Sequence, residues 1–282
     1  MNRRKWFSAA GAFPLIMRAQ KPQGATKGRL SASKDGPGET RWGRSARRKK
    51  EVTKTVSWPS HEPLEFYLRR GRHDENWPEL YELQHTPRNI QAMADGGVRY
   101  GRLHFYKGFG LQMETPDIQK TQRMAELMHQ HGMKVSLYVA GTMFVEAFRR
   151  ELPASKDWEQ RDLVGRPVPY TTTQTYRHYP CPNEPAYREY IKKVLRVGIE
   201  SVKADQFFFD NVQLQPEPKS CRCPRCIDGF KQFLREKYPT KEAAFLRYGY
   251  PDPDYIELTE WDVYNRADDV GVVDDPVLQE WI

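Results

Sequence analysis

Long apolar runs are scarce in this sequence, and the longest one lies near the start. Residues 6–17 carry no charged side chain and follow a pair of arginines, and Ala19 comes shortly after them. A stretch of this length is too short to cross a bilayer, which takes about 20 apolar residues in a helix, so no permanent membrane span is expected. A twin arginine, a short apolar run and a small residue are typical of a twin-arginine secretory signal. We therefore predict a signal peptide over residues 1–19 and export to the periplasm or the extracellular space, with an ordinary apolar N-terminus as the alternative.

Large apolar side chains are almost missing from residues 18–54. This stretch holds twelve Lys and Arg residues against three acidic ones, a net charge of +9. A segment of that composition buries too little apolar surface to fold, so residues 20–58 are predicted to form a disordered basic linker, or a tether to an anionic surface. The whole chain carries +8 and residues 1–54 account for +12, which leaves −4 on residues 55–282. A mildly acidic folded part argues against a nucleic-acid partner.

Strand-like and helix-like segments alternate from about residue 59 onward. The strand candidates are 100–106, 134–140 and 207–209, with a poorly defined first strand near 64–69. The predicted helices are one that Thr115 caps and Gly132 ends, one that Asn183 caps, and two near residues 223–237 and 241–248. This alternation predicts an α/β fold of right-handed βαβ units around a parallel sheet.

The stretch DQFFFDNVQL, residues 205–214, joins the most apolar tripeptide of this region to a carboxylate. A strand that helices cover on both faces loses its polar alternation, so Phe207–Phe209 are predicted to be a buried parallel strand. In parallel α/β folds the loops after the carboxyl ends of the strands build the functional site. Asp210 is therefore a candidate catalytic carboxylate, with a local role in a turn as the alternative.

Only four cysteines are present, and they lie in one region: Cys181, Cys221, Cys223 and Cys226. An even count in an exported protein invites two disulfides. The Cys-x-Cys and Cys-x-x-Cys spacings, however, place three sulfurs in one tight turn, which suits a tetrahedral metal better than two bridges. We predict a structural zinc ion bound by all four cysteines, with disulfides and free thiols as alternatives. Four sulfurs would leave no position for water, which disfavours a zinc-dependent hydrolase.

Two segments around these cysteines resemble family 42 β-galactosidases. CRCPRCIDGFKQFLREKYPTKEAAFLRYG, residues 221–249, is similar to the segment in which three clustered cysteines open a helix, and YRHYPCPNEPAYREY, residues 176–190, is similar to the segment with the first cysteine. KDWEQRDLVGRPV, residues 156–168, resembles a Trp-x-x-x-Asp-x-x-Gly-x-Pro phrase of related barrel proteins. The resemblance implies a (β/α)8 TIM barrel, zinc on the four cysteines and retaining hydrolysis of β-galactosides.

The chain departs from that family at its catalytic acid. In the family, the strand before the cysteine cluster ends in Asn-Glu, and the Glu is the general acid/base, whereas this chain has Asn211 and Val212. Valine cannot donate a proton, and Asp210 is the nearest carboxylate. An Asp at the tip of the fourth strand is the nucleophile position in other barrel glycosidases, such as those similar to α-fucosidases. Asp210 is therefore predicted to take the principal catalytic role.

Other polar and aromatic residues near the predicted strand ends are candidates for contacts with a sugar. The expected substrate-binding residues are Asn211, His104, Tyr106, Tyr138 and Trp158. Packing in the core or at its rim is the alternative for His104, Tyr106 and Trp158. Glycoside hydrolysis needs a second carboxyl group. Glu114, Glu146 and Glu217 follow strand-like segments, but each is more typical of a solvated loop acid.

The length of the chain limits how much of a barrel is expected. A complete eight-stranded barrel takes about 250 residues, yet only 72 residues follow Asp210. We therefore predict that residues 59–282 form the first half of a (β/α)8 barrel, which more chain or a second copy in a homo-oligomer would complete. The expected function is that of a β-galactosidase-related glycoside hydrolase acting on a carbohydrate, with a non-catalytic carbohydrate-binding or scaffold protein as the alternative.

Overall fold

The computed structural model describes six parts of the chain: residues 54–57, 63–71, 75–212, 215, 220–258 and 275–281. The predicted signal peptide, most of the predicted linker and Glu217 lie outside these described residues. Within them, none of the helices combines the length and the apolar character that crossing a membrane requires.

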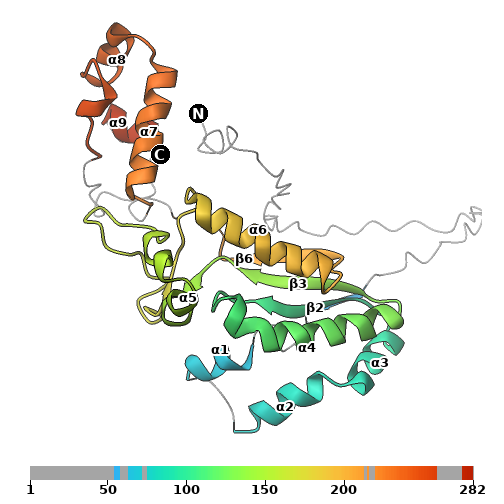
Figure 1. Ribbon diagram of the computed structural model, residues 1–282. Helices are drawn as coiled ribbons and strands as arrows, with labels where there is room; N and C mark the ends of the chain where they lie inside the picture. Colours follow the sequence, from blue (N-terminus) through green and yellow to red (C-terminus); the bar gives the residue numbers. More distant parts are fainter. Residues whose placement is uncertain are drawn as a thin grey trace, which may run out of the picture. The chain divides into compact units, whose positions relative to one another are not determined.

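A parallel sheet of four strands, in the order β1-β2-β3-β6, organises the described residues (Figure 1). The four strands are β1 Lys54–Ser57, β2 Val98–Tyr106, β3 Lys134–Ala140 and β6 Gln206–Asp210. Strand order follows chain order, as in consecutive βα units of a barrel. The predictions of strands at 100–106, 134–140 and 207–209 are confirmed, and so is the prediction that Asp210 ends the fourth strand. A short antiparallel pair, β4 Met143–Phe144 and β5 Arg177–His178, lies beside the sheet.

The first strand lies elsewhere than predicted. Residues 64–69 form a helix, and β1 is made by residues 54–57, so the predicted disorder does not hold for these four residues of the linker. β1 contains the β-branched Thr55 and Val56, which favour extended backbone, and it pairs with β2 in parallel. Such a short strand takes its identity from its neighbour in the sheet rather than from its own composition.

Helices lie in the connections between the strands and follow the last strand, β6. They are α1 Leu64–Arg69, α2 Trp77–Gln84, α3 Pro87–Asp95, α4 Leu111–Gln130, α5 Val145–Glu151, α6 Pro185–Glu200, α7 Pro224–Lys237, α8 Lys241–Tyr248 and α9 Pro276–Trp281. Two starts differ from prediction. α4 begins four residues before Thr115, whose hydroxyl donates back to the Leu111 carbonyl instead of capping the helix. α6 is capped by Glu184, one residue after Asn183, through a bond from the Ala186 amide.

Helices α4 and α6 cover the same face of the sheet. A Cβ atom on Gly101 of β2 would meet the side chain of Met128 on α4, and one on Gly198 of α6 would meet Phe207 and Leu137. Gly101 pairs with Val135, two residues before Leu137, so Gly101 and Leu137 point to one face. A sheet with its crossover helices on one face is of the barrel type, whereas doubly wound sheets carry helices on both. The predicted fold class is confirmed for the four strands described.

The opposite face of the sheet is lined by the side chains that alternate along the strands with those facing the helices. The guanidinium of Arg102 lies 3.6 Å from the centre of the Phe208 ring, and that ring stacks on Tyr138. The prediction that Phe207–Phe209 are buried on both faces is wrong for Phe208 and Phe209, which lie on the last strand of the described sheet. Phe208 and Phe209 are 36% and 40% exposed.

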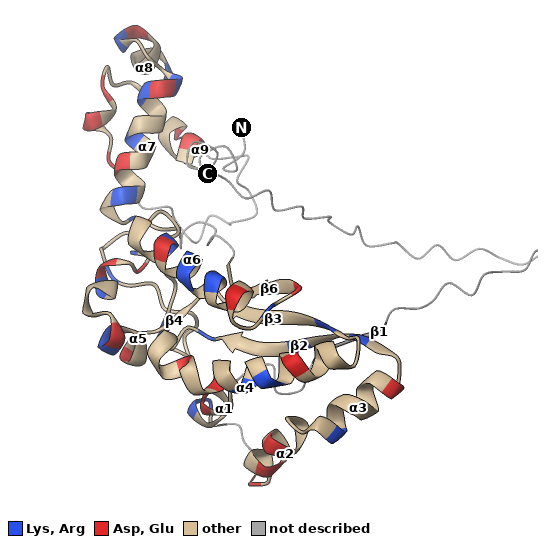
Figure 2. Ribbon diagram, turned by 45° about the vertical axis from the view of Figure 1, so that its right-hand side comes forward, with Lys and Arg blue, Asp and Glu red and all other residues tan. Residues whose placement is uncertain are grey.

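Charged residues recur along helices α6 and α7. Figure 2 shows basic and acidic segments along α6 and α7, in line with the polar outer stripe of an amphipathic helix. Helices α7, α8 and α9 also pack on one another, with the Trp281 ring edge-on to Phe230. The predictions of helices near 223–237 and 241–248 are confirmed.

Candidate active site and cysteine cluster

The carboxyl ends of β2, β3 and β6 bring three ionisable or hydroxyl side chains together. Lys107 follows β2 directly, Tyr138 lies near the end of β3, and Asp210 ends β6. The Lys107 ammonium donates to the Tyr138 hydroxyl at 2.9 Å, and that hydroxyl donates to Asp210 Oδ2 at 2.7 Å. This is the location expected for a functional site in a parallel sheet of this kind.

Asn211 continues the network on the other side of Asp210. Its amide nitrogen donates to Asp210 Oδ2 at 2.9 Å, and its amide oxygen accepts from the Tyr170 hydroxyl at 3.0 Å. The residue has a left-handed backbone, with φ of 57°, which Asn tolerates better than most residues. A side chain at Gly141 would meet its carbonyl oxygen at 2.6 Å, so the loop after β3 passes close to this turn.

A buried arginine lies on the far side of Tyr170. The guanidinium of Arg177 lies 4.1 Å from the centre of the Tyr170 ring and donates to the Thr142 hydroxyl at 2.7 Å and to the Gln174 side-chain oxygen at 3.0 Å. It also lies 5.3 Å from the centre of the Phe66 ring, which comes from α1. Two buried cations, Lys107 and Arg177, thus flank the turn that carries Asp210 and Asn211.

The loop after β2 is held by one buried carboxylate. Glu114, in the first turn of α4, accepts the backbone N–H groups of Lys107 at 2.5 Å, Gly108 at 2.9 Å and Phe109 at 2.8 Å. Its position near the positive end of the helix adds to this stabilisation. Glu114 is therefore a structural clamp, which differs from the solvated loop acid expected from sequence.

Three of the expected sugar-binding residues contact other parts of the fold in packed surroundings. His104 is buried, with Nε2 3.3 Å from Glu114. Tyr106 lies against Tyr190 of α6, and burial raises the pKa of its hydroxyl well above the usual range. Trp158 packs against Phe148 and against Tyr187 and Tyr190 of α6. Their placement supports the packing alternative, whereas Tyr138 and Asn211 do contact Asp210.

Two of the acids considered as a second carboxylate, Glu114 and Glu146, are engaged by other groups of the fold. Both oxygens of Glu114 are taken up by the loop after β2. Glu146 forms an ion pair with Arg69 at 3.0 Å. Sequence reasoning also missed Lys107, Tyr170 and Arg177. The signal that could have found Lys107 is its place immediately after a strand.

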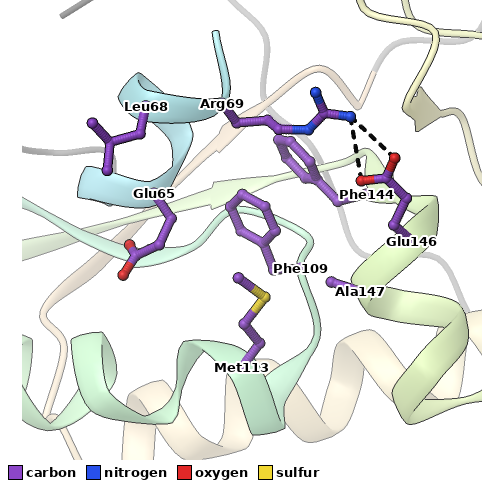
Figure 3. A pocket seen from close by; sticks show the side chains of 8 residues that line it. All are labelled: Glu65, Leu68, Arg69, Phe109, Met113, Phe144, Glu146 and Ala147. Atoms are coloured by element: carbon purple, nitrogen blue, oxygen red, sulfur yellow. Dashed lines mark hydrogen bonds and ion pairs between the residues drawn. The ribbon is translucent and has the colours of Figure 1, made fainter. Parts of the chain in front are cut away.

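A pocket of about 350 Å3 lies beside α1 (Figure 3). Its lining residues are Glu65, Leu68, Arg69, Phe109, Met113, Phe144, Glu146 and Ala147. The stacked rings of Phe109 and Phe144, 3.8 Å apart between centroids, form an apolar wall, and the Arg69–Glu146 ion pair lies at the edge. Phe66, which contacts Phe144, also lies 4.1 Å from the Lys107 ammonium, so one aromatic side chain separates this pocket from the network around Asp210.

The four cysteines form a second polar cluster. All four sulfur atoms lie within 4.8 Å of one another, and Cys181 is 3.5 Å from Cys226 and 3.6 Å from Cys223. A disulfide bond measures about 2.05 Å, so none is formed. Tetrahedral zinc with Zn–S distances of about 2.3 Å separates its sulfurs by roughly 3.8 Å. The arrangement fits such an ion.

Neighbouring groups support the sulfurs. The Arg161 amide lies 3.5 Å from Cys221 Sγ, and the Asn183 side chain donates to Cys226 Sγ at 3.4 Å. Hydrogen bonds with the other thiols raise the pKa of Cys181 and lower that of Cys223. Donors directed at sulfur are the contacts that ligating thiolates receive in metal sites.

Known proteins similar to this chain include several β-galactosidases. The β-galactosidase BgaA of a Thermus species is 27% identical over 61% of this chain and 27% of its own length. The enzyme Bga of Halorubrum lacusprofundi is 27% identical over 57% of this chain and 23% of its own length. The solved β-galactosidase structure from that haloarchaeon covers 74% of this chain and 29% of that chain, with 21% identity and a TM-score of 0.47. No protein-family model matches the chain.

These matches confirm the resemblance to family 42 β-galactosidases, at low identity and over part of the chain. The chain spans about a quarter of the length of the curated relatives that it matches.

Proposed function

From the relationship to β-galactosidases, we propose that this chain supplies part of a glycoside hydrolase site, in which Asp210 is the principal carboxylate. The observation that carries the proposal is the position of Asp210 at the carboxyl end of β6, in contact with Tyr138 and Asn211. In the proposed reaction a carboxylate oxygen of Asp210 forms a bond to the anomeric carbon while the glycosidic oxygen leaves and takes up a proton. Water then cleaves the glycosyl ester and restores the carboxylate.

Val212 makes the source of that proton the critical question. Its side chain carries no proton to donate, and it is 49% exposed next to the candidate site. This observation favours a second candidate function, a carbohydrate-binding protein without turnover. Substrates that differ only in their leaving group distinguish the two, because dinitrophenolate leaves without protonation and an alkoxide does not.

The test compares 2,4-dinitrophenyl and methyl β-galactosides with the complete chain. A glycosidase with a weak or absent acid releases dinitrophenolate and leaves the methyl glycoside nearly untouched. Replacing Asp210 by Asn is expected to lower the first rate by a factor of about 1,000 or more, while Asp162→Asn, which changes a loop carboxylate paired with Arg166, keeps it. Galactose binding without release from either substrate would support the binding protein instead.

We also propose that the cysteine cluster holds one structural zinc ion. The closely spaced sulfurs and their backbone and amide donors support this. Four thiolates would hold the ion with no position open for water, so its contribution is to stability rather than to chemistry.

Metal analysis of the purified protein tests the zinc proposal. About one zinc per chain is expected, with a loss of zinc and a lower melting temperature for Cys181→Ser. Ser220→Ala, which removes a hydroxyl beside the cluster that accepts from Trp281, serves as the control and should keep the metal. Two disulfides and no metal would contradict the proposal.

A further inference from the structure

We infer that Lys107 and Tyr138 are positioning residues, which orient the Asp210 carboxylate through a directed chain of hydrogen bonds. The catalytic role of these hydrogen bonds rests on the proposed glycosidase function, but their geometry does not. Lys107 has no counterpart among the residues expected from sequence, and Tyr138 was expected to touch the sugar directly. In the structure, Tyr138 contacts the Asp210 carboxylate and Lys107 contacts Tyr138.

Backbone contacts fix the position of Lys107. Its backbone N–H is bound by Glu114, and the next residue, Gly108, has φ of +100°. A Cβ atom on Gly108 would meet the Thr142 carbonyl at 1.8 Å, so the loops after β2 and β3 are in direct contact there. The start of the lysine side chain is therefore set by two elements of the barrel wall.

The ammonium group is then held between two aromatic rings. It lies 4.1 Å from the centre of the Phe66 ring and 4.7 Å from that of Tyr138, in cation–π range of both. Lys107 as a whole is only 1% exposed. A buried ammonium is stabilised only if its hydrogens find acceptors, and the Tyr138 hydroxyl is one of them.

The donor properties of the Lys107 ammonium and the Tyr138 hydroxyl fix the direction of these hydrogen bonds. Lysine can donate hydrogen bonds but not accept them, so the Tyr138 oxygen must be the acceptor in that pair. The tyrosine hydrogen is thereby left to point to Asp210 Oδ2. Hydrogen bonds aligned from a cation to a carboxylate strengthen one another.

Asn211 completes the orientation. Because its amide oxygen accepts from Tyr170, its NH2 group faces Asp210 and adds a second donor to Oδ2. No residue in the described part of the chain donates to Oδ1. One carboxylate oxygen is thus anchored by two donors, and the other is left for a reacting partner, which is the arrangement that preorganised catalytic groups show.

A carbon-13 label at Cζ of tyrosine tests the chain without relying on activity, because this carbon reports on the state of the hydroxyl. The Tyr138 resonance is identified by its absence in Tyr138→Phe. We expect it to shift in both Lys107→Met and Asp210→Asn, and to stay in place in Tyr187→Phe, a control on α6. A Tyr138 resonance that is the same in wild type and in Asp210→Asn would overturn the inference.

Kinetics with dinitrophenyl glycosides test the catalytic role separately. Tyr138→Phe and Lys107→Met should lower kcat by about 10- to 100-fold and change KM less than threefold, since in this proposal both side chains act through Asp210. An active wild-type protein with unchanged kcat in both variants would refute the positioning role. A wild-type protein without activity would count against the proposed function alone. The labelled tyrosine would still show whether the hydrogen bonds from Lys107 through Tyr138 to Asp210 are formed.

Discussion

Replacing Asp117 tests whether a partly buried carboxylate lowers the stability of the folded protein. It lies half-buried on α4, where burial is the main cause that raises its pKa from 3.8 to about 6; nearby Glu65 and Glu114 add to this, while His104 and Lys120 act against it. The carboxylate is therefore ionised in the folded protein only at a cost. We expect Asp117→Asn, which keeps the size and removes the charge, to stabilise the protein at neutral pH.

The size of the gain follows from the two pKa values. Each pKa unit corresponds to about 1.4 kcal/mol, so the difference between 3.8 and about 6 sets an upper limit of roughly 3 kcal/mol. Solvent screening of a side chain that is only partly buried reduces this to about 1–2 kcal/mol. Because the folded pKa is raised, the stability contributed by the protonated form is complete below pH 3.8 and is lost as the pH rises through about 6.

Urea unfolding of both proteins at several pH values between 4 and 8 measures this directly. The gain of the Asn variant should be largest above pH 7, shrink as the pH falls through about 6 and disappear near pH 4. Glu126→Gln, an exposed acid on the same helix, should change stability by less than about 0.5 kcal/mol at every pH. A variant that is less stable at pH 7.5, or a gain that does not depend on pH, would refute the reasoning.

Three further outcomes are expected. Gly108→Ala should unfold the protein at a markedly lower temperature in a melting experiment, because the added Cβ meets the Thr142 carbonyl and the backbone has positive φ; Gly132→Ala, with positive φ but open space, should cost less. Glu280→Gln should lower stability by about 1–3 kcal/mol and change Trp281 fluorescence. Burial alone would raise the Glu280 pKa, but bonds from Lys237, Tyr238 and Arg247 lower it, so this contribution should fade as the pH falls below about 4.5 in acid titration. For the proposed signal peptide, N-terminal sequencing of protein recovered from outside the cytoplasm should begin after Ala19, and protein that stays in the cytoplasm with residues 1–19 attached would contradict the proposal.

Local sequence signals predict those elements whose structure depends on local chemistry. β3 matches its predicted range because an apolar run of this length suits a buried strand, and α8 does so because Thr240 caps it and Gly249 ends it in the left-handed conformation. The start of α4 could not be predicted in this way. Glu114 draws the helix start forward by binding the backbone of the loop before it, which is a tertiary contact.

Some residues of the candidate site could likewise be predicted from local sequence, and others depend on contacts with distant segments. Asp210 and Tyr138 could be placed together because the carboxyl ends of neighbouring parallel strands meet at one edge. Lys107 and Arg177 could not, because a cation is buried only where aromatic rings and acceptors from distant segments surround it, as Phe66 and Tyr170 do here. His104 illustrates the opposite case: its place at the end of a strand suggested contact with a sugar, whereas its side chain is buried beside Glu114, in line with the packing alternative.

The cysteine cluster has a consequence for the unfolded chain. Cys181 and Cys226 are 45 residues apart, and the segment between them contains α6, β6 and Asp210. The proposed zinc ion, or any other cross-link between these two cysteines, would close this segment into a loop. By the chain-entropy estimate for a cross-link of that length, closure removes freedom from the denatured chain worth about 4 kcal/mol. With the proposed ion bound, the strand that carries Asp210 would find its partner β3 from within a closed loop, and the cross-link would favour its return to the sheet without touching the carboxylate.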